Sequence, residues 1–440
     1  MLEKLAQILS EAVEAGPNVY LRCQPEVFDF TDPEAKCELS ILGMGDNGAT
    51  VTVTKDNVNM LFCILKLAFG KGTKVIAWNW KPLATYLLAK TGKLLILESI
   101  LIDLKIIEKY AGVTEKAPAS LAVAMNRLKA VVQSGAWKEA QATYQGVYLP
   151  LITTVVPAME TAGILDTEKG KKVFAHYEVH GQENGRLRAD GSFRDGFVPH
   201  TMSEGDRKKL KPRSHSDIFM YFDFKNMEVA VLQHLAKDGN LKEVLEKDDA
   251  YTEIYKLVTG IENDPDAREK SKKMFLPVIY GAGPARLVQR MGIAQATAER
   301  IIDRIHGLFP ASLQWVESHQ KQAKETGSAK DVFGKRRTFD SGEEYLARNF
   351  SIQSPASTVC LDKLVQLHHA LKPVSDIAYS VHDGYCVYAG KDNWKEVFQK
   401  GYAVLTSESG VCPGLRLKVA CRAGRNLDSL KPLAKAKGAT

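Results

Sequence analysis

The fold of this chain is decided by two stretches, YFDFKNMEVAVLQHLAKD (residues 221–238) and YSVHDGYCVY (residues 379–388). Each places an aspartate, Asp223 or Asp383, at the end or turn of an apolar run rich in residues that favour strands. Taken singly, each acid has an ordinary interpretation. Asp223 could begin a helix, and Asp383 with Gly384 could form a hairpin turn. The segment between the two stretches argues for a shared role.

That segment, REKSKKMFLPVIYG (residues 268–281), predicts a basic helix. Four of its residues are spaced by four and so lie along one face, namely Arg268, Lys272, Leu276 and Tyr280. Arginine and lysine bind phosphate oxygens, and two carboxylates can hold two Mg²⁺ ions. An ordinary amphipathic helix would explain the cations, but neither the Tyr280-Gly281 ending nor the flanking acids. The order acid, basic helix, acid therefore indicates nucleotidyl transfer.

The composition agrees with a soluble globular protein of two or three domains. The 440 residues include 45% apolar and 25% charged residues, which are ordinary values. The net charge of +7 fits a polyanionic partner without requiring one. The seven cysteines show no Cys-x-x-Cys spacing, which favours reduced thiols over a zinc site. No apolar run approaches the roughly 20 residues of a membrane span, so we expect a cytoplasmic protein with no membrane partner.

Hydrophobic periodicity and turn residues predict alternating elements in the first third of the chain, which suggests an α/β domain there. The predicted strands are 37–44, 49–54, 74–80 and 217–224, with two more in 377–390 joined at residues 382–384. The predicted helices are 57–70, 81–92, 150–163, most of 343–371, and a region from 226 to 326 interrupted near 238–250, 260–266 and 281–284. Residues 330–340 are predicted to form a hairpin.

The three segments resemble motifs A, B and C of family A DNA polymerases, which include bacterial repair, mitochondrial and phage replicative enzymes. Motif A there is an aspartate, four residues and a glutamate, as in Asp223 and Glu228. Motif B is arginine, three residues, lysine, seven residues and Tyr-Gly, as in residues 268–281. Motif C is His-Asp-Glu and here reads His382, Asp383 and Gly384. The resemblance covers roughly residues 150–390 and includes four further stretches in the family's order, 151–166, 184–188, 333–339 and 348–357.

The resemblance implies an α+β right-hand polymerase fold with an antiparallel palm sheet, helical fingers and a reduced thumb. An N-terminal α/β domain of RNase H-like exonuclease type would precede it. The expected domains are a degenerate 3′–5′ exonuclease (1–148), the start of the palm (149–235) with a thumb stub (167–184), the fingers (236–329), and the rest of the palm with a C-terminal tail (330–440). A phage or similar replicon would be the source, with the host cytoplasm as the location.

The implied activity is template-directed addition of dNTPs to a primer 3′-hydroxyl by two-metal phosphoryl transfer. Two Mg²⁺ ions, with Mn²⁺ as an alternative, would be held by Asp223, Asp383 and the carbonyl of Phe224. Lys272 would act as general acid, and Glu228 would exclude a 2′-hydroxyl. The expected nucleotide-binding residues are Glu228, Tyr251, Arg268, Lys272, Leu276 and Tyr280. The expected primer–template contacts are Arg186, Tyr280, Gly281, Arg348, Asn349, Gln353 and His382.

The sequence also departs from the family pattern. Gly384 replaces the usual glutamate and removes a third carboxylate, and Leu276 replaces a usual phenylalanine or tyrosine. Pro277 lacks an N–H and should kink the helix. Only residues 167–184 remain where the family has its helical thumb, so we expect weak duplex binding and a processivity or replisome partner that replaces the thumb.

The N-terminal domain keeps few of the acids that proofreading needs. Asp29-Phe30-Thr31 stands where the exonuclease pattern has Asp-x-Glu, Leu83 stands where its second aspartate is expected, and residues 137–150 offer no third one. The chain should therefore lack proofreading, because two metals cannot be held without these carboxylates. An unrelated α/β domain is the alternative interpretation of this region.

Three other functions remain open. A single-subunit RNA polymerase shares the palm, but Glu228 in the gate position argues against it. A catalytically inactive primer–template binding or scaffold protein fits Gly384 and the small thumb, whereas retention of both aspartates, Arg268 and Lys272 argues against it. The motifs could also be accidental in an unrelated mixed α/β protein.

Overall fold

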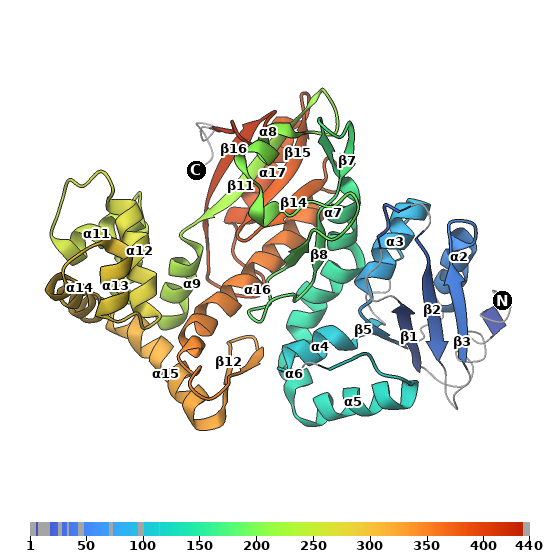
Figure 1. Cartoon of the computed structure of the whole chain (residues 1–440), viewed down its shortest axis with the longest axis horizontal. Helices are drawn as coiled ribbons and strands as arrows, with labels where there is room; N and C mark the ends of the chain where they lie inside the picture. Colours follow the sequence, from blue (N-terminus) through green and yellow to red (C-terminus); the bar gives the residue numbers. More distant parts are fainter. Residues whose placement is uncertain are drawn as a thin grey trace. The chain divides into compact units, whose positions relative to one another are not determined.

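The computed structural model of the chain is shown in Figure 1. It describes residues 6–7, 18–24, 29–32, 35–42, 48–69, 74–95, 101–113 and 115–433. The chain divides into two compact units. Unit 1 comprises residues 1–223, 358–411 and 419–440, and unit 2 comprises residues 224–357 and 412–418.

Unit 1 begins with a five-stranded sheet in the order β3-β2-β1-β4-β5. Its strands are β1 (Asn18–Gln24), β2 (Cys37–Leu42), β3 (Gly48–Val53), β4 (Lys74–Trp78) and β5 (Leu101–Asp103). The first three strands pair antiparallel, whereas β1, β4 and β5 pair in parallel. The helices that alternate with them are α2 (Val58–Phe69), α3 (Lys81–Thr91) and α4 (Leu104–Tyr110). The predicted alternation of strands and helices is confirmed, and β1 is a strand that the sequence did not predict.

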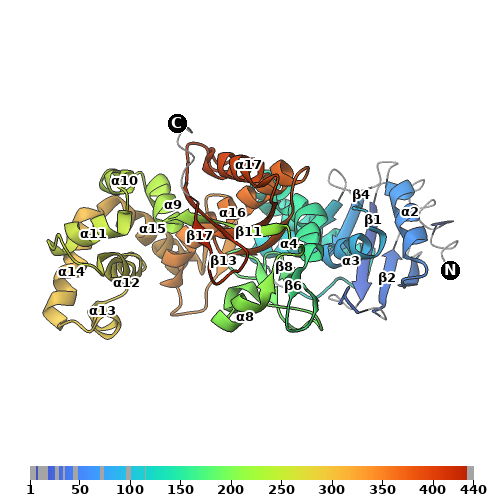
Figure 2. The same cartoon turned by 90° about the horizontal axis from the view of Figure 1, so that it is seen from above.

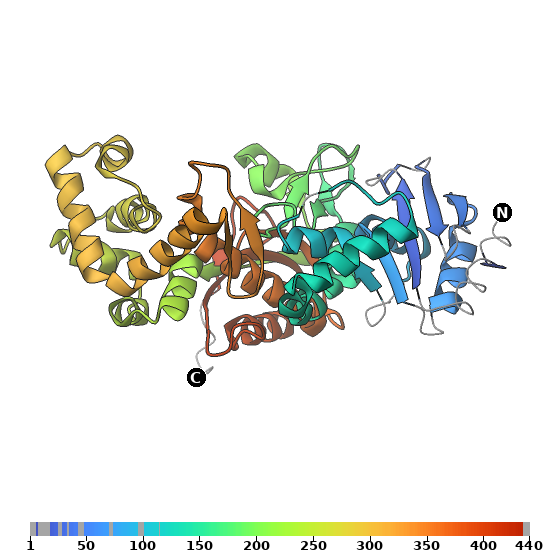
Figure 3. The ribbon, with the colours of Figure 1, turned by 90° about the horizontal axis from the view of Figure 1, so that it is seen from below.

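A long helical run leads from this sheet toward the second sheet of unit 1. After α5 (Leu121–Gln133), the run consists of α6 (Ala136–Thr143), η2 (Tyr144–Tyr148), η3 (Leu151–Val155) and α7 (Val156–Ala162). Within η3, the hydroxyls of Thr153 and Thr154 donate to carbonyls four residues earlier. The run ends at Gly163, which has a φ of +66°. Helix α7 packs against both α3 and β14 (Ile377–Val381). The view from below shows α5, in teal, in the foreground (Figure 3).

Short strands follow α7 and connect to the second sheet. They are β6 (Ile164–Asp166), β7 (Lys171–Val173), β8 (His176–Glu178) and β9 (Arg188–Asp190). After them come η4 (Pro199–Thr201), α8 (Glu204–Lys209) and β10 (Leu210–Lys211), the last of which pairs with β6. Residues 167–184, predicted to be a thumb stub, form a turn and the strands β7 and β8.

The second sheet of unit 1 has the strand order β14-β15-β11-β16-β17. Its remaining strands are β11 (Asp217–Lys225), β15 (Gly384–Gly390), β16 (Lys418–Gly424) and β17 (Lys431–Pro432). Helix α17 (Trp394–Thr406) covers one face of this sheet (Figure 2). On that face, the ring of Phe222 lies against Gly401 and Phe398 of α17. The antiparallel pairing of β14 with β15 confirms the two strands predicted around Asp383.

Unit 2 is mainly helical and contains the basic segment. Its helices are α9 (Met227–Ala236), α10 (Gly239–Glu246), α11 (Ala250–Thr259), α12 (Ala267–Ile279), α13 (Pro284–Met291), α14 (Gln295–Leu308), α15 (Pro310–Thr326) and the first part of α16 (Leu346–Leu371). The hairpin of β12 (Ser328–Lys330) and β13 (Arg336–Thr338) confirms the predicted one. Two details differ from the expectations. Residues 238–250 contain helix α10 instead of a break, and Asn226 rather than Asp223 precedes the first turn of α9.

The core of unit 2 explains why these amphipathic helices assemble. Met274, Phe275 and Ile279 of α12 are buried together with Ile305 and Phe309. Helix α12 continues through Pro277 to Ile279. Within the described part of the chain, no helix is long and apolar enough to span a bilayer.

Candidate active site

Two aspartates that are far apart in sequence lie at neighbouring positions in the second sheet of unit 1. Strand β11 pairs with β15 so that Asp223 stands opposite Gly384, the residue that follows Asp383. His382 and Asp383 form the two-residue turn between β14 and β15, and His382 has a left-handed φ of +50°. Both aspartates are half-buried. The strand register therefore brings together the two acids that the sequence predicts as metal ligands.

The chemistry of this acid pair fits magnesium. Mg²⁺ is typically held by one or two carboxylates together with water and substrate phosphates, so it does not need a full protein cage. Within the described ranges, no group of three histidine, cysteine or acidic side chains could hold a metal ion by itself. The residues present thus fit ions shared between Asp223, Asp383 and a phosphate-bearing substrate.

A tyrosine that the sequence did not single out lies beside these acids. Tyr221 and Asp223 are two residues apart on β11, so their side chains project from the same face of the sheet. A Cβ atom added to Gly384 would lie 2.6 Å from Cζ of Tyr221 and closer still to its hydroxyl oxygen. Burial raises the pKa of the Tyr221 phenol, and the charges of Asp223 and Asp383 raise it further. The hydroxyl therefore stays protonated near the carboxylates.

Three basic side chains gather near the turn, and two of them were predicted. The ring of His382 packs edge-on against that of His200, with centroids 4.8 Å apart. Burial, together with the nearby charges of His382 and Arg186, lowers the pKa of His200 to about 4. The predicted primer contacts Arg186 and His382 thus lie within electrostatic reach of the same histidine. The sequence predicted no role for His200, which is a lone histidine before α8.

In unit 2, the predicted nucleotide-binding residues form two contacts. The Arg268 guanidinium lies over the ring of Tyr251, 5.6 Å from its centroid, and pairs with Asp249. The hydroxyl of Tyr280 donates to Oε2 of Glu228 at 2.6 Å. The fold of unit 2 therefore joins four of the predicted residues in two pairs, which their spacing in the sequence did not indicate.

Lys272 is the other cation on the face of α12 that carries Arg268. It pairs with Glu269, one turn away, at 2.8 Å. Leu276 is partly buried against the core of unit 2. The Lys272–Glu269 pair is exposed to solvent, and such surface pairs contribute little stability, so a phosphate can replace the carboxylate at little cost.

The predicted template-contacting residues adjoin the end of α12. Gly281 has a φ of +94°, and a Cβ atom there would lie 3.4 Å from Cδ of Arg348. Arg348 donates to Gln320 at 2.6 Å and pairs with Glu317 at 3.2 Å. A cavity of about 480 Å³ is lined by Tyr280, Gly281 and Arg348, among others. Asn349 and Gln353 follow on α16, spaced by four residues on one face and half-buried.

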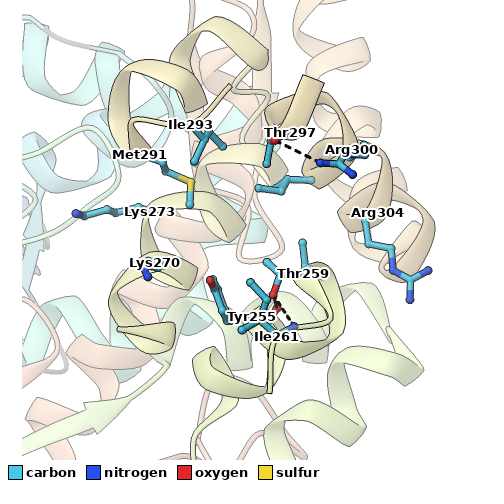
Figure 4. A pocket seen from close by; sticks show the side chains of 12 residues that line it. Tyr255, Thr259, Ile261, Lys270, Lys273, Met291, Ile293, Thr297, Arg300 and Arg304 are labelled. Atoms are coloured by element: carbon cyan, nitrogen blue, oxygen red, sulfur yellow. Dashed lines mark hydrogen bonds between the residues drawn. The ribbon is translucent and has the colours of Figure 1, made fainter. Parts of the chain in front are cut away.

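Helix α12 has a second basic face, which the motif spacing did not indicate. It lines a cavity of about 640 Å³ within unit 2, with Lys270 and Lys273 on one side and Arg300 and Arg304 on the other (Figure 4). Lys270 and the Tyr255 hydroxyl hold the pKa of Asp264 at about 2. Arg304 donates to a main-chain carbonyl and Arg300 to the Thr297 hydroxyl. Most of these cations therefore have partners inside unit 2.

Comparison with known proteins agrees with the motifs. The sequence model described as "DNA polymerase family A" matches residues 137–429. The thermostable DNA polymerase I of Thermus filiformis is 30% identical over 189 residues, which cover 40% of this chain and 23% of that protein. DNA polymerase I of Chloroflexus aurantiacus is 24% identical over 281 residues, which cover 60% of this chain and 30% of that protein. The matched parts span less than a third of these curated relatives.

A solved structure shares the fold. It is described as "POL domain of Pol1 from M. smegmatis complex with DNA primer-template and dNTP", and it superposes with a TM-score of 0.73 at 16% sequence identity. The superposition covers 97% of this chain and 98% of that one. Because the family's sequence model matches more than half of the 440 residues, this chain belongs to DNA polymerase family A.

Proposed function

We propose that the protein is a template-directed DNA polymerase that adds deoxynucleotides to the 3′ end of a primer. The observation that carries the proposal is the register of β11 against β15, which sets Asp223 opposite the residue after Asp383. The M. smegmatis structure is a complex with a DNA primer-template and a dNTP, which supports the same substrates here.

Asp223, Asp383 and the main-chain carbonyl of Phe224 would hold two divalent ions, Mg²⁺ or Mn²⁺. When bound, such ions lower the pKa of an attacking hydroxyl and neutralise charge on phosphates. The protein's part is to hold the carboxylates at fixed positions. Two hydrogen-bonded strands do this for Asp223, and a two-residue turn does it for Asp383.

Arg268 and Lys272 would bind the triphosphate, and Lys272 would donate a proton to the departing pyrophosphate. Arginine can bind phosphate oxygens through two parallel hydrogen bonds, whereas lysine offers a single charge that can transfer its proton. The aromatic ring of Tyr251 beneath the Arg268 guanidinium supports this role, because it orients the guanidinium.

Glu228 would exclude ribonucleotides by occupying the space of a 2′-hydroxyl. The hydrogen bond from Tyr280 supports this assignment, since it fixes one carboxylate oxygen of Glu228. Tyr280 would also stack near the templating base, with Leu276 on the sugar side. Ribonucleotide incorporation should therefore be low, which argues against an RNA polymerase.

Primer and template would be bound by the side chains predicted to contact them. His382 and Arg186 would contact the primer end, and Gly281, Arg348, Asn349 and Gln353 would contact the template. Because residues 167–184 form only a turn and two short strands, we propose that a partner protein supplies the duplex binding that a helical thumb would give.

We further propose that the N-terminal sheet is a degenerate exonuclease without proofreading activity. The acids near this sheet already have structural partners. Asp103 accepts hydrogen bonds from the main-chain N–H groups of Asn79, Trp80 and Ile106. Asp29 accepts hydrogen bonds from Thr31 and from the main-chain N–H of Arg194.

A primer-extension assay with the wild-type chain and the Asp383→Ala variant tests the polymerase. We expect extension by the wild type with Mg²⁺ or Mn²⁺ and none by the variant. Equal extension by both would refute the mechanism. Tight primer–template binding by a wild type that extends nothing would instead identify an inactive binding protein. Shortening of a labelled single strand would refute the loss of proofreading.

A further inference from the structure

The space of the missing third carboxylate is filled. Asp223 and Gly384 are directly opposite on neighbouring antiparallel strands, so a side chain at position 384 would project from the same face as Asp223. Tyr221 already stands there. The first atom of such a side chain would lie 2.6 Å from Cζ of Tyr221 and closer still to its hydroxyl oxygen. Such distances are far below any van der Waals contact, so the residue at position 384 depends on Tyr221.

We propose that the Tyr221 hydroxyl takes the place of the third acid of the metal site. The residues at positions 221 and 384 therefore depend on each other. In this role the hydroxyl donates a hydrogen bond to water bound on the ions that Asp223 and Asp383 hold. Tyr221 is therefore a positioning residue that acts on the ions through their water ligands. The inference rests on the proposed polymerase function for the identity of the ions.

The surroundings of Tyr221 fit a fixed polar group. Its ring lies under the Arg422 guanidinium of β16, 5.6 Å from the ring centroid. It also lines a small cavity of about 200 Å³ with Arg207 and Arg422. Its backbone is held in the ladder opposite Cys386. A stacked ring on a central strand has few alternative rotamers, so its hydroxyl is held at a defined point beside the acid pair.

A neutral hydroxyl and a carboxylate differ in what they give an ion. A carboxylate adds a full negative charge, whereas a phenol adds only a directed hydrogen bond to a water ligand. Mg²⁺ retains several of its waters, so groups that bind those waters influence its position. Removal of such an outer partner typically costs about 10–100-fold in metal affinity or activity. The chain should thus bind divalent ions more weakly than a three-acid site.

The test follows Mn²⁺ binding by electron paramagnetic resonance, in which free and bound ions are distinguished. The samples are the full chain alone and the full chain with dNTP and a primer–template whose primer ends in a dideoxynucleotide. The variants are Tyr221→Phe, Gly384→Glu and the double change Tyr221→Ser with Gly384→Glu. Primer extension and melting temperature are measured in parallel.

We expect Tyr221→Phe to lower Mn²⁺ affinity by about 10-fold with little change in melting temperature. Gly384→Glu alone should lose both stability and Mn²⁺ binding, because its side chain collides with Tyr221. The double variant should recover stability and bind Mn²⁺ at least as tightly as the wild type. Wild-type Mn²⁺ affinity in Tyr221→Phe, or a stable Gly384→Glu that binds Mn²⁺ as the double variant does, would overturn the proposal.

Two matched controls separate packing from positioning. Tyr385→Phe removes a hydroxyl from the paired strand β15, where it donates to the Cys360 carbonyl at 2.7 Å. Gly401→Ala sets a Cβ atom 2.7 Å from the Phe222 ring on the opposite face of the same sheet. Both should lower the melting temperature and leave Mn²⁺ affinity unchanged.

Failure of the polymerase proposal would be detected in the primer-extension assay, in which the wild type would extend no primer. In that case the Mn²⁺ titration of the chain alone still decides the role of Tyr221, since it needs no substrate. A 10-fold difference between wild type and Tyr221→Phe, as expected for a lost outer partner, would support it, and equal affinities would refute it.

Discussion

Two strands of unit 1, each in a different sheet, have an aspartate at or near their end, and the surroundings of these two acids differ. Asp103 at the end of β5 is 1% exposed, and its oxygens accept main-chain hydrogen bonds from Trp80 and Ile106. Asp223 near the end of β11 is half-buried and lies beside a second acid, Asp383. An acid at a strand end is thus a structural cap when backbone donors surround it, and a candidate metal ligand when another acid is its neighbour.

The largest expected effect concerns the sheet with two acids. Asp223→Ala or Asp383→Ala should reduce primer extension by about 1,000-fold or more, because metal ions supply several kcal/mol of transition-state stabilisation. Single-turnover extension at saturating dNTP measures the loss. Asp103→Ala is the control and should change the extension rate of the folded enzyme little. A comparable loss in Asp103→Ala would mean that the two acids do not differ in their importance for primer extension.

The next effect concerns the acid that joins the N-terminal sheet to α7. Glu160 is fully buried, accepts hydrogen bonds from Lys81 and Thr85 at 2.7 Å each, and also accepts one from the Tyr177 main-chain N–H. Glu160→Leu leaves the Lys81 ammonium without its partner, and breaking a buried pair in this way costs about 3–5 kcal/mol. Urea denaturation measures the loss.

The double variant Lys81→Met with Glu160→Leu sharpens the second prediction. Replacing both partners by apolar groups of similar size should recover most of the stability. If the double variant is as unstable as Glu160→Leu alone, then hydrogen bonds to Thr85 and Tyr177, and not the ion pair, hold α7 against α3.

These comparisons also indicate how far the sequence could be interpreted. The spacing of Asp223, Glu228, Arg268 and Lys272 identified the candidate catalytic segments, because each motif is local and its residues lie within one or two turns of an element. The turn at His382 and Asp383 was equally local. For these residues, a spacing of two along a strand or of four along a helix decides which face of the element a side chain occupies. The structure agrees with the expected strands and helices.

What the sequence could not predict depends on pairings between distant segments. The contact of Tyr221 with Gly384 requires the register of β11 on β15, and a shift of one residue would have moved Tyr221 to the other face. His200 reaches His382 from η4, a helix of three residues that is too short to show a periodicity. The hydrogen bond from Tyr280 to Glu228 joins two helices. In the sequence, only the absence of the usual acid at Gly384 marked this position as unusual.

A third prediction concerns the pH dependence of stability and His176 of β8. Burial lowers the pKa of His176 to about 4, and its ring stacks on Phe193 with centroids 3.5 Å apart. In the unfolded chain its pKa is about 6.5, so below pH 6.5 the unfolded state binds the extra proton first. The free energy of unfolding should therefore fall as pH drops from 6.5 to about 4, by up to about 3 kcal/mol.

His176→Phe isolates this contribution, because phenylalanine keeps the aromatic contact and cannot be protonated. Urea denaturation at about pH 7, 5.5 and 4.5 should give a shallower pH dependence for the variant than for the wild type. Parallel curves for both proteins would show that the acid sensitivity arises from other groups, of which His200 and His368 have similarly low pKa values of about 4.

The smallest expected effect returns to Asp103 and tests its assignment as a cap. Its side chain accepts hydrogen bonds from Trp80 at 2.7 Å and from Ile106 in the first turn of α4 at 3.3 Å. Asp103→Ala should lower the free energy of unfolding by about 1–2 kcal/mol, the typical cost of losing a helix cap. Asp103→Asn should recover only part of this loss, because its one amide oxygen can accept from Asn79 and Ile106 while its NH2 group cannot accept from Trp80. Burial raises the pKa of Asp103, so a neutral amide suits this site, whereas Asp383→Asn should remain inactive because an amide cannot replace a charged metal ligand. Equal tolerance of asparagine at both positions would mean that neither aspartate needs its charge.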